Sequence, residues 1–168
     1  MSSHFELHIV PISDKMYRYA LSILKEPETA HDVVQECLMK IWDKRNMLDT
    51  IDNMEAWVIR ITRNQCYDWV RTNRFSVLTV EEMEKSDPID ADQMTLVNNQ
   101  QDWLDQVLES LPQKQKEVFH LREVEDLSYQ DIADVLSVSL DEVKVTLHRA
   151  RNKVRSSMQK IEGYGIAN

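Results

Sequence analysis

The residues best suited to bind a charged ligand lie near the C-terminal end of the chain. The segment from Val143 to Lys160 carries six basic side chains and no acid. Two helix-capping signals precede it, each a serine followed three residues later by a carboxylate, at Ser128–Asp131 and Ser139–Glu142. Between them the sequence predicts a short helix over Tyr129–Leu136 and a three-residue turn. A short helix, a tight turn and a basic second helix form the helix-turn-helix plan for binding DNA.

The basic helix separates into two faces when its residues are placed at 100° intervals. The apolar stripe predicted to be core consists of Val143, Leu147, Ala150 and Val154, with Leu140 beside them. On the opposite face, the N-terminal part of such a helix reads base edges. The candidates for base contact there are Lys144, Val145, His148 and Arg149. The candidates for phosphate contact further along are Arg151, Lys153 and Arg155.

The same charges allow a simpler interpretation. Basic residues in the C-terminal half of a helix suit the helix dipole, and many solvated helices carry them. Asp141 and Glu142 suit the N-terminus in the same way. Either they only cap the helix, or one of them accepts a hydrogen bond from cytosine N4.

A net charge of −9 is unsuited to DNA for the chain as a whole, but the charge is unevenly distributed. Residues 1–75 have a net charge of −1, residues 76–102 of −6 and residues 103–168 of −2. Because charges further apart than about 10 Å are largely screened, local clusters of positive charge govern contact with phosphates.

The sequence predicts an all-α fold. Only two glycines and four prolines are present, which argues against a fold with many turns. Apolar residues at helical spacing predict helices over Ile9–Leu24, about Glu28–Met47 and roughly Met54–Asn73, with a polar loop at Leu48–Asn53. A second helical unit begins at Trp103, and Pro112 suits the first turn of its next helix. We therefore predict two small helical domains, residues 1–75 and 103–168, joined by an acidic linker over residues 76–102.

Several classes of protein are disfavoured. Cys37 and Cys66 stand singly and the five histidines are scattered, so we expect no metal site and no cofactor. No nucleophile–base pair or phosphate loop is recognisable, so no enzymatic activity is expected. No apolar run is long enough to cross a membrane and no signal-peptide pattern is present, which favours a cytoplasmic protein without membrane insertion.

Two sets of motifs carry a resemblance to a known family. In the first predicted domain they are Tyr17–Ala20, Ala30–Trp42, Ala56–Asn64 and Asp68–Arg71. In the second they are Leu111-Pro112, Val118–Arg122, Leu127–Ala133, Glu142–Lys144 and His148–Arg151. They resemble regions 2 and 4 of the sigma factors of bacterial RNA polymerase. No region 3 domain fits into the linker, which is typical of the small extracytoplasmic-function group.

The resemblance implies a promoter-specificity subunit that binds core RNA polymerase, recognises the −35 and −10 promoter elements and promotes DNA melting. It implies contact with the β′ clamp helices and the β flap, and an anti-sigma factor as a further partner. By family position, the residues facing the clamp helices are Asp32, Gln35, Glu36 and Lys40. Those facing the −10 element are Arg60, Arg63, Asn64, Tyr67 and Arg71, with the loop Met47–Met54 forming a base pocket.

The segment from Trp57 to Phe75 supports the −10 assignment in physical terms. Its arginines alternate with aromatic residues, which suits single-stranded DNA because charges follow the backbone and rings stack on bases. Trp57 is the exception, since we expect it in the core. The chain also departs from the family, with Ser137 where many relatives have glycine, Glu142 where they have threonine, and Lys116 where they have arginine.

Two alternatives remain. A stand-alone helix-turn-helix regulator would bind palindromic duplex DNA as a dimer without polymerase, but would leave the arginine–aromatic segment unexplained. A helical adaptor with no role on DNA would tolerate charge reversal along Val143–Lys160.

Overall fold

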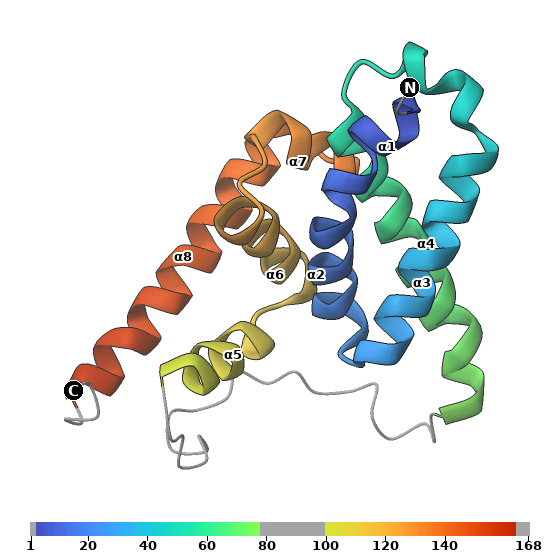
Figure 1. Cartoon of the computed structure of the whole chain (residues 1–168). Helices are drawn as coiled ribbons and strands as arrows, with labels where there is room; N and C mark the ends of the chain where they lie inside the picture. Colours follow the sequence, from blue (N-terminus) through green and yellow to red (C-terminus); the bar gives the residue numbers. More distant parts are fainter. Residues whose placement is uncertain (1–2, 78–99, 164–168) are drawn as a thin grey trace. The chain divides into compact units, whose positions relative to one another are not determined.

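The computed structural model describes residues 3–77 and 100–163, and within these ranges the elements are helical and no strand occurs (Figure 1). This confirms the all-α fold class. The described residues form two compact units: one holds residues 3–77 with 130–138, and the other holds 100–129 with 139–163. The division into domains at residues 75 and 102 stays a prediction, and most of the acidic linker lies outside the described residues.

The first unit is built around three long helices: α2 (Ser13–Leu24), α3 (Pro27–Asp43) and α4 (Met54–Val77). Each of the three packs against the other two. Their fully buried side chains, all of them at helical spacing, include Met16, Tyr19 and Ala20 of α2, Ala30, Cys37 and Ile41 of α3, and Val58, Ile59 and Cys66 of α4. This packing holds the outer faces of α3 and α4 in place.

The helix predicted from Ile9 begins later than expected. Two short elements, α1 (His4–His8) and the 3-10 helix η1 (Val10–Ile12), come first, and α2 begins only at Ser13. Pro11 lies in the first turn of η1, where its missing N–H costs no helical hydrogen bond. The predicted break after α2 is confirmed, because Lys25 adopts a left-handed φ of 66° and Glu26 is extended before Pro27.

The second predicted helix ends earlier than expected. It stops at Asp43 instead of near Met47, and the 3-10 helix η2 (Arg45–Thr50) takes up much of the predicted loop. The Lys44 N–H turns to the Ile41 carbonyl at 3.0 Å, which tightens the last turn. Trp42 follows Leu38 by four residues and so fits the apolar stripe of this helix by spacing, yet it is 44% exposed.

The second unit contains α5 (Gln100–Ser110), α6 (Gln113–Phe119), the π-helix η5 (His120–Val124) and α8 (Leu140–Gly163). Pro112 is the N-cap of α6 and so stands one position before the expected first turn. The apolar core here is formed by Trp103, Val107, Leu111, Ala150 and Val154. The predicted stripe of α8 is confirmed as buried, except that Leu140 at its start is 37% exposed.

The helix-turn-helix pattern is present at the predicted residues. Helix α7 spans Tyr129–Leu136, and α8 begins at Leu140 after a three-residue turn. Ser139 caps α8, because its Oγ accepts a hydrogen bond from the Glu142 N–H at 3.1 Å. Ser137 in the turn has a φ of 55°, the left-handed geometry for which relatives commonly use glycine.

Candidate DNA-binding and polymerase-binding surfaces

The polar face of α8 is open to solvent. All four residues predicted to touch bases, Lys144, Val145, His148 and Arg149, are exposed. They stand opposite the buried stripe that fixes the helix in the second unit. Val145 is the informative member, since an apolar side chain that is 48% exposed contributes little to the fold and suits contact with a thymine methyl.

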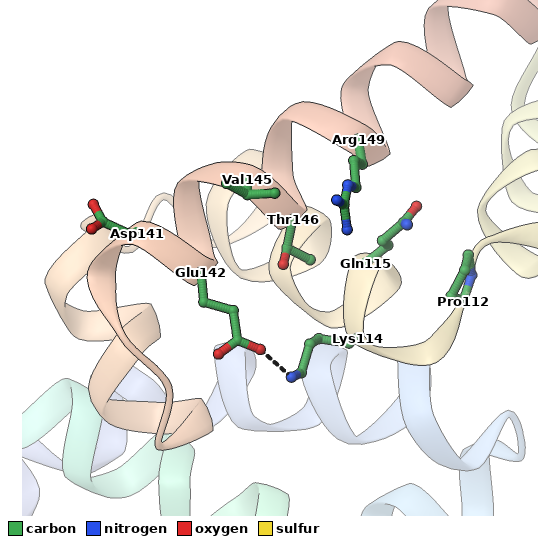
Figure 2. Close-up of a pocket in the computed structure, with 8 residues that line it drawn as sticks. All are labelled: Pro112, Lys114, Gln115, Asp141, Glu142, Val145, Thr146 and Arg149. Atoms are coloured by element: carbon green, nitrogen blue, oxygen red, sulfur yellow. Dashed lines mark hydrogen bonds and ion pairs between the residues drawn. The ribbon is translucent and has the colours of Figure 1, made fainter.

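A shallow groove of about 480 Å³ borders this face, between the start of α6 and α8 (Figure 2). The residues that line it are Pro112, Lys114 and Gln115 from the α6 side and Asp141, Glu142, Val145, Thr146 and Arg149 from α8. The side chains of Lys114 and Glu142 form an ion pair within it. The sequence did not predict that α6 lines this groove, because the spacing around Lys114 does not indicate an ion pair with a residue 28 positions later.

The predicted phosphate contacts differ in availability. The Arg151 Nε donates to Glu123 Oε1 at 2.5 Å, and this hydrogen bond raises the pKa of the guanidinium. The Lys153 ammonium lies 3.4 Å from the Ser110 carbonyl oxygen. Arg155 is exposed. The side chains of Arg151 and Lys153 are thus bonded to neighbouring elements of the same unit, and the side chain of Arg155 is exposed to solvent.

The −10 candidates lie along α4. Arg60, Asn64 and Arg71 are exposed, whereas Arg63 and Tyr67 are half-buried. The Arg63 guanidinium lies 4.7 Å from the centroid of the Tyr67 ring, so the two form a cation–π pair.

The other residues of this segment differ in exposure and in ion pairing. Arg71 is paired with Asp68 within the helix. Trp57, expected in the core, is only half-buried, and Trp69 is 38% exposed. The side chains of Arg74 and Phe75 lie outside the described part of the chain.

The polymerase-binding candidates Asp32, Gln35, Glu36 and Lys40 are all exposed on one side of α3. Lys40 lies 3.4 Å from Glu36 and also donates a hydrogen bond to Gln65 of α4. The predicted polar face therefore exists, and one of its four members is tied to the adjacent helix.

An apolar groove that sequence analysis did not predict continues this face. It has a volume of about 330 Å³ and is lined by Phe5, Gln35, Leu38, Met39, Trp42 and Asp43. The Trp42 ring meets the Phe5 ring at a right angle, with 5.1 Å between their centroids, and the Arg45 guanidinium lies 4.7 Å from the Trp42 centroid. The signal available in the sequence was Met39, an apolar residue on the otherwise polar side of α3 that is 67% exposed.

The described ranges, residues 3–77 and 100–163, were compared with the requirements of a metal site and of a membrane-spanning helix. No group of three histidine, cysteine or acidic side chains there is arranged to hold a metal ion. None of the helices in those ranges is long and apolar enough to cross a bilayer. Cys37 and Cys66 are both buried, and burial raises the pKa of the Cys37 thiol to about 12.

Two family models match the parts of the chain that contain these surfaces. The model of sigma-70 region 2 matches residues 12–76, and the model of sigma-70 region 4 matches residues 101–154. The RNA polymerase sigma-E factor of Streptomyces coelicolor is 27% identical over 154 residues, which cover 92% of this chain and 85% of that protein. The RNA polymerase sigma factor YlaC of Bacillus subtilis is 28% identical over 137 residues, which cover 79% of this chain and 79% of that protein.

A solved structure shares the fold. The sigma factor RpoE of Bartonella quintana, crystallised with the anti-sigma factor NepR, aligns with a TM-score of 0.71 at 24% identity. The alignment covers 92% of this chain and 96% of that one. The two family models together, the named relatives and this shared fold lead to one conclusion: the chain belongs to the extracytoplasmic-function sigma factors, the promoter-specificity subunits of bacterial RNA polymerase, which are not enzymes.

Proposed function

We propose a division of labour among three helices. Helix α3 binds the β′ clamp helices of core polymerase, α4 holds the opened −10 strand, and α8 reads the −35 duplex. The observation that supports this best is on α8, where the whole predicted base-contact set is exposed over a fully packed apolar stripe. A helix that only covered a core would have no need of an exposed Val145 beside Lys144.

The −10 role falls mainly to Arg60 and Asn64. They stand four residues apart on α4 and are therefore neighbours on one face, and both are exposed. Arginine tracks the backbone of an unpaired strand, and an asparagine amide both donates and accepts hydrogen bonds on a base edge. The paired Arg63 and Tyr67 lie beside them and offer a rigid stacking surface.

The polymerase role rests on the exposed polar side of α3 and on the apolar groove next to it. Gln35 belongs to both, since it is a predicted contact and also lines the groove. An apolar centre with a polar rim is the usual composition of a protein interface. Contact of the second unit with the β flap belongs to the same proposal.

The solved relatives suggest a further partner. RpoE of Bartonella quintana was crystallised with the anti-sigma factor NepR, and the structure of CnrH was solved in complex with the cytosolic domain of CnrY. We extend this to the present chain and propose that an anti-sigma factor holds it inactive in the bacterial cytoplasm, where the polymerase works.

Run-off transcription with purified core polymerase tests the proposal as a whole. Core supplemented with the chain should initiate at a cognate promoter, and core alone should not. Glu36→Arg should weaken binding to core, whereas the matched change Asp14→Arg, at an exposed acid on α2, should not. A chain that neither binds core nor directs initiation contradicts the proposal, and tight binding to a palindromic duplex without core would favour the stand-alone regulator.

Asn64→Ala should impair promoter opening more than −35 duplex binding. Permanganate reactivity of the melted region measures the first and band shift the second. His148→Ala is the control, because this exposed residue belongs to the predicted base-contact set of α8 and should show the reverse pattern. Equal loss of both activities in Asn64→Ala refutes the assignment of this residue.

A further inference from the structure

The acid at the start of the recognition helix has a defined partner. Lys114 Nζ bonds Glu142 Oε1, which leaves Oε2 as an acceptor. Figure 2 shows the two side chains turned toward one another, with Asp141 turned away from the pair. The Ser139 cap fixes the backbone of Glu142 from the other side. Glu142 is therefore held both at its backbone N–H and at its carboxylate.

Glu142 shares one side of α8 with two predicted base contacts. Val145 and Arg149 follow it by three and seven residues, the spacing of a single helical ridge. All three line the same groove. The Glu142 side chain is 43% exposed in spite of the ion pair, so it remains accessible from outside.

The ion pair changes what an acid can do next to DNA. An isolated carboxylate would be repelled by the phosphates, but a lysine bonded to it cancels its charge as seen from a distance. At hydrogen-bond range the carboxylate remains an acceptor with its lone pairs intact. Lys114 thus permits the close approach of Glu142 to a base edge.

On the basis of the proposed −35 role of α8, we propose that Glu142, positioned by Lys114, selects a cytosine in the −35 element. In the major groove cytosine presents the N4 amino group as its donor. Guanine presents only acceptors there, thymine an acceptor and a methyl group, and adenine an acceptor beside its amino group. A carboxylate is repelled by each of these acceptors, so cytosine is the base that it favours. Glu142 is the specificity residue and Lys114 a positioning residue.

The test uses holoenzyme made from core polymerase and the full chain, with promoters that carry every base at each −35 position. Transcript yield per sequence should show a preference for cytosine at one position, of about three- to tenfold for a single hydrogen bond. Glu142→Gln should shift this preference toward adenine, since the amide can also donate to N7. Lys114→Met should weaken the preference at that position alone, and Lys114→Arg should retain it.

The outcomes separate this inference from the function on which it rests. Base preference at other positions should stay unchanged in every variant, which a loss of folding would not produce. If Glu142→Gln leaves all preferences intact, or lowers yield equally for all bases, the inference is wrong although the −35 role stands. If the wild-type holoenzyme ignores the −35 sequence, the role of α8 itself fails. Asp141→Asn is the charge-matched control, and a shifted preference there would assign the reading to Asp141 and overturn the proposal.

Discussion

Salt dependence of promoter binding should distinguish Arg155 from Arg151, although both were expected to contact phosphate. Each phosphate contact contributes about 0.9 to the slope of log affinity against log salt, or about a 3.5-fold loss of affinity between roughly 50 and 200 mM salt. Arg155 is exposed, so Arg155→Ala should lower the slope by about that amount. Arg151 is bonded to Glu123, so Arg151→Ala should lower it by much less.

The strength of the Arg151–Glu123 ion pair determines how far the salt-dependence slopes of the two variants differ. The two side chains are 40% and 36% exposed, which places the pair among partly solvated ion pairs worth roughly 0.2–1 kcal/mol. A phosphate contact in moderate salt is worth a similar amount, so the intramolecular carboxylate competes with DNA on nearly equal terms. Glu123→Gln should remove the competitor and raise the slope by up to about 0.9.

The measurement is holoenzyme affinity for a promoter fragment at several salt concentrations, by fluorescence anisotropy. Arg155→Ala serves as the matched control, because it removes the same side chain one turn further along α8. Equal slopes for Arg151→Ala and Arg155→Ala would show that Arg151 leaves Glu123 to bind phosphate, and the argument from the ion pair would be refuted. A slope unchanged by Glu123→Gln would refute it as well.

Two further predictions concern the cores of the two units. Leu147→Ala should lower the free energy of unfolding by about 2–5 kcal/mol, measured by urea titration, whereas Leu140→Ala at a 37% exposed position should cost much less. In the first unit, burial raises the pKa of Cys37 from 9.0 to about 12, so the unfolded thiol ionises first and stability should fall as pH rises from 9 to 12. Cys37→Ala should flatten that dependence relative to the wild-type chain, and equal pH profiles would contradict it.

The helix-turn-helix follows closely from sequence where packing and capping agree. The bounds of α7, the length of the turn and the buried stripe of α8 coincide with the predictions, because each is fixed within about ten residues of chain. The sequence-based predictions are wrong where residues distant along the chain determine the environment of a side chain. Trp42 fits an apolar stripe by spacing, yet its environment is set by Phe5 from α1 and by Arg45 after the helix end.

The same reasoning explains which site residues could be recognised. Type and spacing identified the exposed polar face of α8, since exposure of one helical face follows from burial of the other. They could not show that Arg151 is bonded to Glu123 or that Lys114 reaches Glu142, because both partners lie 28 residues away along the chain. Spacing therefore predicts where a cation stands and not whether it is available to DNA.

The turn between α7 and α8 shows how the fold replaces a residue that the sequence lacks. Ser137 takes the left-handed conformation, and the following Val138 N–H bonds the Ala133 carbonyl at 3.1 Å, a hydrogen bond that closes the last turn of α7. This is the Schellman arrangement, in which the position of Ser137 is normally glycine because a side chain there costs roughly 1 kcal/mol. Ala133 is buried and Val138 partly so, and apolar contact between these two positions commonly accompanies the motif. The turn thus retains the geometry that lets α8 begin at Leu140 without a glycine.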